Sequence, residues 1–452
     1  MAAGEAQHGR FLFARRARER RRLATVSRLI AFLGIAGFAS LFPMSQARAA
    51  SGYLKPAVSA KALRRAESHH RDGVEFYKRR RYRAALRKFA AAEEVCPELF
   101  SAGYHVALVH RKIGDEEAAI AQLRKLNARF PENIIAHNDL GVIYASKNEE
   151  DSERLALHEF ETAVRNGEDL LQGKEEKVPQ VRVDLAMAYA NLAGLQLKSS
   201  RLTSAERNFR KSIEHYPFSF FGHFGVGNVL FAMKRLGEAK TAYRKAQRIE
   251  PNNPNVHIAL AKCYLLAEDK NPRFAIAELK KVEEDGAPSE VFDLLGDAHA
   301  LLGNTKQAAI YYRRYLTTPD PSPQALYKLG VLYYNEANWE EARKYLEKFL
   351  AAGPEEQEGA LSTAYKLLGD IASEERDYER AVAHYLQGSK LRKAYLSCYY
   401  GLAESYFHLK RYEKAKECLA LVLKGLPQGG GPEENELREK AFALLKALRS
   451  QE

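Results

Sequence analysis

An alanine recurs along this chain at intervals close to 34 residues, and this spacing limits the possible folds more than any other feature. The successive intervals are 34, 37, 49, 34, 36, 33, 34, 39 and 34 residues. The recurring residues are Ala85, Ala119, Ala156, Ala205, Ala239, Ala275, Ala308, Ala342, Ala381 and Ala415. Self-similarity at such a period is typical of solenoids, in which each repeat packs only against its neighbours.

Other residues keep a fixed place relative to each alanine. A large apolar residue follows four positions later, as Phe89, Leu123, Phe160, Phe209, Tyr243, Leu279, Tyr312, Leu346, Tyr385 and Leu419. A small residue such as Gly73 or Gly227 precedes it, and a proline such as Pro97 follows in six repeats. Because proline ends helices, each repeat is predicted to be a pair of helices. We expect the small residue to face the alanine, and the large residue to fill the space toward the next pair.

These positions resemble the tetratricopeptide repeat (TPR) family, whose repeat is a 34-residue helix–turn–helix. The segments PNNPNVHIALAKCY, DLLGDAHALLGNTKQAAIYYRRYL and ALYKLGVLYYNEANWEEARKYLEKFL match its pattern closely, and the resemblance covers about residues 66–427, or ten repeats. It implies an all-α fold, a right-handed superhelical solenoid of about ten repeats. Residues 433–450 are amphipathic and are expected to form a C-terminal capping helix over the last apolar face.

The predicted organisation has six parts. Residues 1–49 are read as a signal peptide and 50–65 as an N-terminal lead-in. Repeats 1–3 occupy 66–170 and repeats 4–10 occupy 181–427, while 428–452 form a Gly-rich link and the capping helix. Residues 171–180 are an insertion between repeats 3 and 4. We expect a joint there, and whether it is flexible stays open.

The first 49 residues have the features of an export signal. A basic region precedes Leu29–Phe42, fourteen residues without a charge, and Ala47 and Ala49 flank a potential cleavage site. This order is the secretory pattern, and fourteen residues are fewer than the ~20 that span a bilayer comfortably. We expect cleavage after Ala49 and an exported, periplasmic protein. The alternative is an inner-membrane protein anchored by an uncleaved signal, and a translation start near Val26 is also open.

The net charge of +12 is distributed unevenly. Nine arginines and two glutamates lie in residues 1–49, which leaves a mild excess over the rest. The stretch RYRAALRK at residues 81–88 is basic, but its apolar positions belong to the first repeat. An exported protein does not meet nucleic acid, so no nucleic-acid partner is expected. A weak contact with a membrane surface near the N-terminus is left open.

The sequence shows no recognisable catalytic or metal-binding pattern. It has no GxxxxGK[ST] loop, no HExxH and no G-x-S-x-G. The glycines of GHFGVG, from Gly222 to Gly227, fall inside a first helix and are interpreted as sites of close helix packing. We therefore expect no enzyme activity, no catalytic residues, no metal and no cofactor.

The TPR resemblance implies a concave groove lined by the first helix of each repeat. The aromatic residues that fall on groove positions, and which we predict to bind a partner, are Tyr77, Tyr104, Phe224, Phe231, Tyr327, Tyr334, Tyr400 and Phe407. Aromatic rings give interfaces much contact area at little entropic cost, but the same rings could belong to the core. Asp293 and Asp297 predict an acidic middle of the groove.

Taken together, the sequence predicts a non-catalytic scaffold that binds proteins or peptide segments in the bacterial cell envelope. The resemblance implies a role in assembling a secretion, pilus or polysaccharide export complex, without choosing among them. A peptide-binding, chaperone-like adaptor is the main alternative, and an enzyme with an unrecognised site is the least favoured. The identity of the partner and the oligomeric state stay open.

Overall fold

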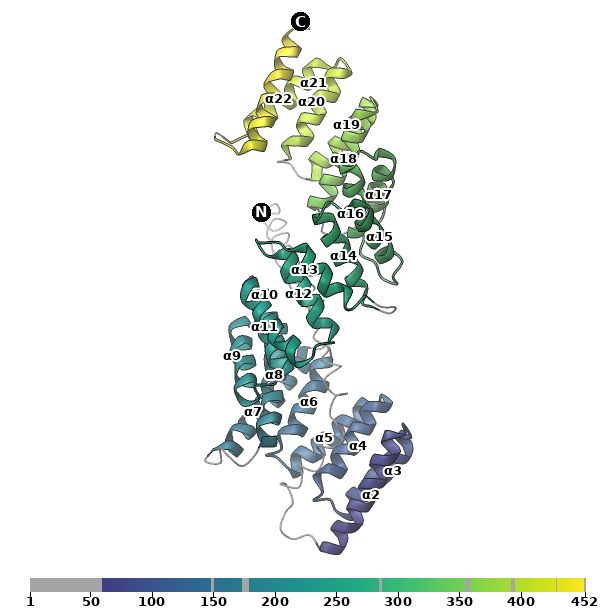
Figure 1. Ribbon diagram of the computed structural model, residues 1–452, viewed down its shortest axis with the longest axis vertical. Coiled ribbons are helices and arrows are strands. Elements are labelled where there is room, and N and C mark those ends of the chain that lie inside the picture. Colours follow the sequence, from purple (N-terminus) through teal and green to yellow (C-terminus); the bar gives the residue numbers. More distant parts are fainter. Residues whose placement is uncertain are drawn as a thin grey trace, which may run out of the picture. The chain divides into compact units, whose positions relative to one another are not determined.

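The computed structural model describes residues 59–147, 150–172, 179–283, 287–353, 358–391, 395–427 and 429–450. The predicted signal peptide lies outside these residues. All regular elements of the described part are α-helices, as the fold-class prediction required. The chain divides into two compact units, Met1–Ala267 and Glu268–Glu452, which are described separately (Figure 1).

The described residues of the first unit form five helical hairpins and one further helix. The hairpins are α2 with α3, α4 with α5, α6 with α7, α8 with α9, and α10 with α11, and each hairpin packs on the next. The bounds are α2 Ala60–Lys78, α3 Tyr82–Val95, α4 Phe100–Ile113, α5 Glu116–Arg129, α6 Ile134–Ser146, α7 Glu150–Leu171, α8 Pro179–Lys198, α9 Leu202–His215, α10 Phe220–Ala232, α11 Leu236–Ile249 and α12 Pro254–Leu266.

In the second unit, one helix precedes four hairpins and a last helix follows them. The hairpins are α14 with α15, α16 with α17, α18 with α19, and α20 with α21. The bounds are α13 Pro272–Lys280, α14 Ser289–Leu301, α15 Thr305–Leu316, α16 Gln324–Asn335, α17 Trp339–Ala351, α18 Glu358–Glu374, α19 Tyr378–Leu391, α20 Leu396–His408, α21 Tyr412–Gly425 and α22 Pro432–Arg449. With α12 and α13 as the sixth sequence repeat, this agrees with the predicted ten repeats.

First and second helices differ in how much of their surface is buried. The first helix α10 has the sequence FFGHFGVGNVLFA and is buried over most of its length, because helices pack on several of its sides. The second helix α9 buries only Ala205, Phe209 and Ser212 and exposes a charged face. This is the pattern expected of a layer of inner helices covered on one side by amphipathic ones.

The turns inside the hairpins share one geometry wherever the structure describes the turn position. The residue two positions before the second helix has a positive φ in eight hairpins, and six of these residues are not glycine: Arg80, Ser200, Lys234, Ala337, Arg376 and Lys410. The next backbone N–H donates to the carbonyl five residues back, as from Arg81 to Phe76 at 2.9 Å. This is a Schellman cap, which satisfies the last carbonyls of the first helix and reverses the chain.

The repeat-defining residues form the core of every hairpin. All ten recurring alanines have no exposed surface, and the ten large apolar residues that follow them are at most 3% exposed. A Cβ on Gly73 would lie 2.7 Å from the Phe89 ring of the same hairpin. A Cβ on Gly369 of the same hairpin would lie 2.6 Å from the Tyr385 ring, and one on Gly401 of the next hairpin would lie 2.4 Å from it. The large residue therefore contacts the next hairpin, as expected. It also lies against the small residue of its own hairpin, which we had expected to face the alanine.

The ends of the array agree with a capped solenoid. Helix α22 packs against α20 and α21 and buries Ala441 and Leu448 completely, as expected of a cap. The insertion at 171–180 contains residues 173–178, which lie outside the described residues, so the joint there stays a prediction. The helices that flank it, α7 and α8, pack against each other.

Candidate functional site

Neighbouring first helices touch within each unit. In the first unit α6 contacts α8, and α8 contacts α10; in the second unit α16 contacts α18, and α18 contacts α20. The first helices therefore form a continuous surface, on which side chains of successive repeats lie next to one another. We call the part formed by α16, α18 and α20 the α16–α18–α20 face.

A single lysine pairs with both aspartates of α14. The Nζ atom of Lys328, on α16, lies 2.8 Å from Asp293 and 2.7 Å from Asp297, and the lysine side chain is 23% exposed. Burial acts to lower the pKa of Lys328, but the two carboxylates outweigh it and raise that pKa. The negative charge predicted for the middle of the groove is thus partly offset, because one cation from the next repeat pairs with both carboxylates.

Asp370 of α18 is held by three donors from three helices. The hydroxyl groups of Tyr334 on α16 and Tyr385 on α19 donate to it at 2.8 and 2.7 Å, and Lys366 Nζ lies at 2.5 Å. Burial, followed by the charge of Asp370, raises the pKa of both tyrosines. The carboxylate is therefore fixed in orientation, with Lys366 beside it on the α16–α18–α20 face.

A tyrosine-to-carboxyl or tyrosine-to-amide bond recurs inside hairpins. Tyr243 donates to Asn228 at 2.8 Å, and Tyr312 donates to Asp297 at 2.8 Å, each across fifteen residues. Tyr385 and Asp370 have the same separation. Buried hydroxyl groups need such partners, because an unpaired one costs about 1–3 kcal/mol. Sequence reasoning missed these pairs, although the signal was present: each tyrosine at this repeat position has Asn or Asp fifteen residues earlier.

In the first unit, the surface of α4, α6 and α8 carries buried polar contacts instead. Tyr104 donates to Asp139 at 2.7 Å, and Asn191 donates to Asn138 at 2.8 Å. Burial, opposed by a hydrogen bond from Gln180, raises the pKa of Asp184 to about 7. The bonds of Tyr104 and Asn191 join one repeat to the next. Few polar groups on this surface therefore remain available to bind a partner.

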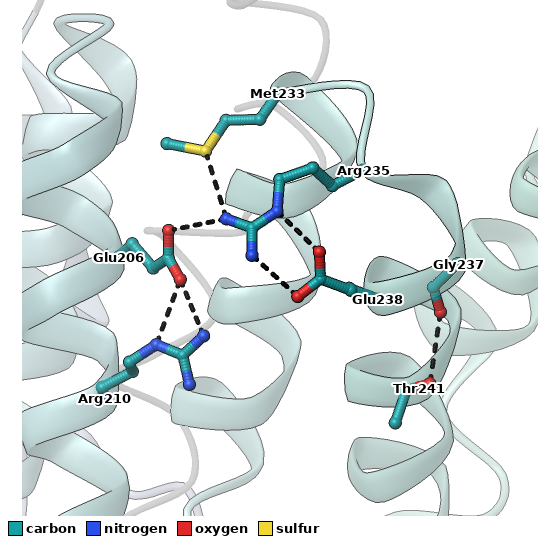
Figure 2. Close-up of polar contacts among 7 residues, drawn as sticks. All are labelled: Glu206, Arg210, Met233, Arg235, Gly237, Glu238 and Thr241. Atoms are coloured by element: carbon teal, nitrogen blue, oxygen red, sulfur yellow. Dashed lines mark hydrogen bonds and ion pairs between the residues drawn. The ribbon is translucent and has the colours of Figure 1, made fainter.

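A pocket of about 480 Å³ lies on the other side of the first unit, between α9, α10 and α11. Val226 and Leu230 are buried apolar residues that line it. Two residues that line it, Arg210 and Glu238, belong to the ion pairs drawn in Figure 2. Glu206 accepts from Arg210 at 2.7 Å and lies 3.4 Å from Arg235, and both nitrogen-to-oxygen bonds from Arg235 to Glu238 are 2.7 Å long. These exposed ion pairs link α9 to α11 and are worth about 0.2–1 kcal/mol each.

The described part of the chain offers few means for chemistry. It contains no group of three or more His, Cys, Asp or Glu side chains that could hold a metal ion. Cys96, Cys263 and Cys398 are buried, and burial raises the pKa of the Cys263 and Cys398 thiols to about 12. Within the same residues, no helix combines the length and the apolar character needed to cross a membrane.

Family comparisons agree with the geometry. Models described as tetratricopeptide repeat match residues 101–133, 230–298, 324–354 and 366–429. The chain is a TPR protein. TPR arrays serve as protein–protein interaction scaffolds, and their fold is typically non-catalytic.

Similarity to individual known proteins is distant. The human Protein O-mannosyl-transferase TMTC3 is 24% identical over 332 residues, which cover 65% of this chain and 35% of that protein, so the chain matches about a third of its length. The solved structure of the APC/C hetero-tetramer Cut9-Hcn1 is 16% identical, covers 84% of each chain and has a TM-score of 0.41. PilF of Pseudomonas aeruginosa is 23% identical over 48% of this chain and 96% of its own, also with a TM-score of 0.41.

Two of the eight rings predicted to bind a partner belong to the core of this TPR protein. Tyr104 is 7% exposed, and its hydroxyl group donates a hydrogen bond to Asp139. Phe224 is 4% exposed and stacks on Phe220, with the ring centroids 5.5 Å apart. Their burial leaves no ring face for a partner, because neighbouring repeats cover them. The prediction is corrected for these two residues.

The other six rings are half-buried, so one side of each packs and part of the ring stays accessible. They are Tyr77, Phe231, Tyr327, Tyr334, Tyr400 and Phe407. Tyr334 packs on Trp339 at 5.3 Å, and Phe407 packs on Tyr412 at 5.9 Å, each at the start of the second helix of its hairpin. Four of the six lie on α16 and α20, on either side of Lys366 and Asp370 of α18.

Proposed function

We propose that this TPR protein is a non-catalytic scaffold of the bacterial cell envelope and that the α16–α18–α20 face of its second unit binds a partner polypeptide. The observation that supports this assignment is the arrangement on three adjoining helices. Tyr327 and Tyr334 lie on α16, Tyr400 and Phe407 lie on α20, and Lys366 and Asp370 lie between them on α18.

This arrangement suits polypeptide recognition for a physical reason. Interfaces draw most of their binding energy from a few aromatic anchors that are already held rigidly before binding. Here the inner side of Tyr334 is fixed by Trp339 and by Asp370, and the ring of Tyr327 rests on Phe349 at 5.3 Å. Little side-chain entropy is therefore lost on association, and the fixed charges of α18 add specificity.

The proposed envelope location is supported by residues 1–49, the predicted signal peptide. Its basic region and short apolar segment are those of an export signal, and the resemblance that the repeats carry places such proteins in secretion, pilus or polysaccharide assemblies. N-terminal sequencing of protein recovered from the envelope fraction tests this part of the proposal. A mature chain that begins ASGYLKP supports export with cleavage after Ala49, and an intact Leu29–Phe42 segment in the membrane fraction supports the anchored alternative.

The scaffold role is tested by capture with the full chain as bait. We expect one or two proteins bound at stoichiometric amounts, because the rings and charges of one face select a particular surface. A chaperone-like adaptor would instead retain a broad range of proteins at substoichiometric amounts. That result, or turnover of a small-molecule substrate by the purified chain, would contradict the scaffold assignment.

A further inference from the structure

Seven basic residues gather at the turn of the first described hairpin. Lys78, Arg79, Arg80 and Arg81 form the turn between α2 and α3, and Arg83, Arg87 and Lys88 follow on α3. The five arginines are all exposed. Lys78 lies 3.4 Å from Glu75 and Lys88 lies 2.8 Å from Asp72, whereas none of the five arginines forms an ion pair or a side-chain hydrogen bond within the described residues.

Two of the three later arginines at the same place pair with the hairpin before them; the third, Arg201, forms no such pair within the described residues. Arg81, Arg235 and Arg411 each directly precede the second helix of their hairpin. Arg235 contacts Glu206 of the preceding hairpin at 3.4 Å (Figure 2), and Arg411 contacts Glu379 of the preceding hairpin at 2.6 Å. Arg235 and Arg411 are therefore parts of the contact between repeats.

The chain before α2 offers no such carboxylate. No aspartate or glutamate occurs between Glu19 and Glu67, a stretch that includes the whole segment leading into the first hairpin. The five arginines of the cluster are thus left without a carboxylate partner from the segment before the hairpin. A cluster of this kind is stabilised by an anionic surface outside the chain.

We propose that the α2–α3 turn binds the anionic headgroup surface of a lipid bilayer. Each basic residue near such a surface strengthens binding by about fivefold, and the effect fades within a Debye length, so residues must be concentrated at one exposed tip to add up. The Schellman turn supplies that tip, because it projects Arg79, Arg80 and Arg81 from the end of the hairpin. A bilayer is favoured over nucleic acid because the leader directs the chain to a membrane, a point that rests on the proposed export.

The test uses the full chain and phosphatidylcholine vesicles with and without phosphatidylglycerol, at low and at high ionic strength. The turn variant replaces Arg79, Arg80, Arg81, Arg83 and Arg87 with glutamine. The control variant removes the same charge from exposed sites elsewhere, by replacing Arg207, Arg248, Lys306, Arg376 and Lys424 with glutamine. Since all ten side chains are exposed, both variants should keep the wild-type melting curve.

We expect the turn variant to bind phosphatidylglycerol vesicles on the order of 1000-fold more weakly than the wild type, and the control to change by less than about threefold. Added salt should remove most of the wild-type binding. In wild-type protein, amide hydrogen exchange in residues 76–84 should slow when these vesicles are present. This readout reports on the turn itself, independently of the basic leader and of where the protein resides in the cell.

Three results would overturn the proposal. Equal binding by the two variants would show that the leader or the net charge, and not the turn, attracts the protein. Unchanged exchange in residues 76–84 in the presence of bound vesicles would show the same without any substitution. Loss of binding to a DNA oligonucleotide in the turn variant, with vesicle binding retained, would identify a nucleic-acid site instead.

Discussion

Gly225→Ala is expected to lower the free energy of unfolding of the first unit by about 3 kcal/mol, at the upper end of the cost of overpacking a core. A Cβ at this position of α10 would lie 2.2 Å from Phe209 of α9, and three atoms of that ring would be within 2.4 Å. Phe209 is only 3% exposed, so the ring cannot swing away into solvent. Either the ring leaves its rotamer or α9 and α10 move apart.

Gly194→Ala is the matched control, because Gly194 lies in α8 of the same unit and a Cβ there would meet no atom within 4 Å. Alanine should then stabilise the helix by about 0.5–1 kcal/mol, since glycine loses more backbone entropy on folding. Urea unfolding followed by circular dichroism measures both variants. Shifts of the same sign in the two midpoints would show that helix propensity, and not close packing against Phe209, governs these glycines.

Lys328→Met is expected to destabilise the second unit by about 1–3 kcal/mol at neutral pH, because it leaves the half-buried Asp293 and Asp297 without their cation. Methionine preserves most of the length of the side chain, so the loss reflects charge more than volume. Lys344→Met is the control: its Nζ pairs with Glu341 at 2.7 Å on the outer face, and such exposed substitutions change stability by about 0.5 kcal/mol at most.

The pH dependence of this difference separates charge from packing. Burial raises the pKa of Asp293, Lys328 opposes that rise, and the neighbouring Asp297 adds to it. Without Lys328, the pKa of Asp293 in the folded variant should lie further above its value in the unfolded chain. A raised carboxyl pKa costs stability at high pH, and this cost disappears as protonation becomes favourable. The defect should therefore shrink as the pH falls from 7 toward about 5; a pH-independent defect would assign Lys328 a packing role alone.

Repetition explains how much of the fold could be predicted. Ala85, Ala342 and the other recurring alanines could be placed in the core because a large apolar residue follows each of them four positions later in all ten repeats, even where an insertion lengthens the interval. The same holds for the glycines of GHFGVG, since Gly225 and Gly227 do lie against Phe209 and Tyr243. Local spacing is enough for such contacts, because both partners belong to the same or the next hairpin.

The candidate site was harder to predict because its contacts depend on which side chains meet across repeats. Nothing in the spacing of Asp293 and Asp297 shows that Lys328 lies between them, since the lysine comes from the following repeat. Tyr104 and Phe224 occupy groove positions by count but are covered in the structure, and counting alone cannot tell a covered ring from an open one. The division at Ala267 likewise leaves no clear mark in the repeat pattern.

The affinity of the captured partner for ring variants of the second unit tests the central claim most directly. The double variant Tyr400→Leu with Phe407→Leu keeps the apolar part of each side chain that packs on α20 and its neighbours, but removes the accessible part of both rings. Ile310→Ala with Leu421→Ala is the matched control, because these residues are 48% and 49% exposed on the second helices α15 and α21 of the same unit.

We predict that the double ring variant binds the partner about thirtyfold more weakly, the loss expected when interface anchors worth about 2 kcal/mol are removed. Its melting temperature should stay close to that of the wild type, and the control should bind normally. Unchanged affinity of the ring variant, or loss of affinity in the Ile310 and Leu421 control instead, would contradict the claim that the α16–α18–α20 face holds the partner.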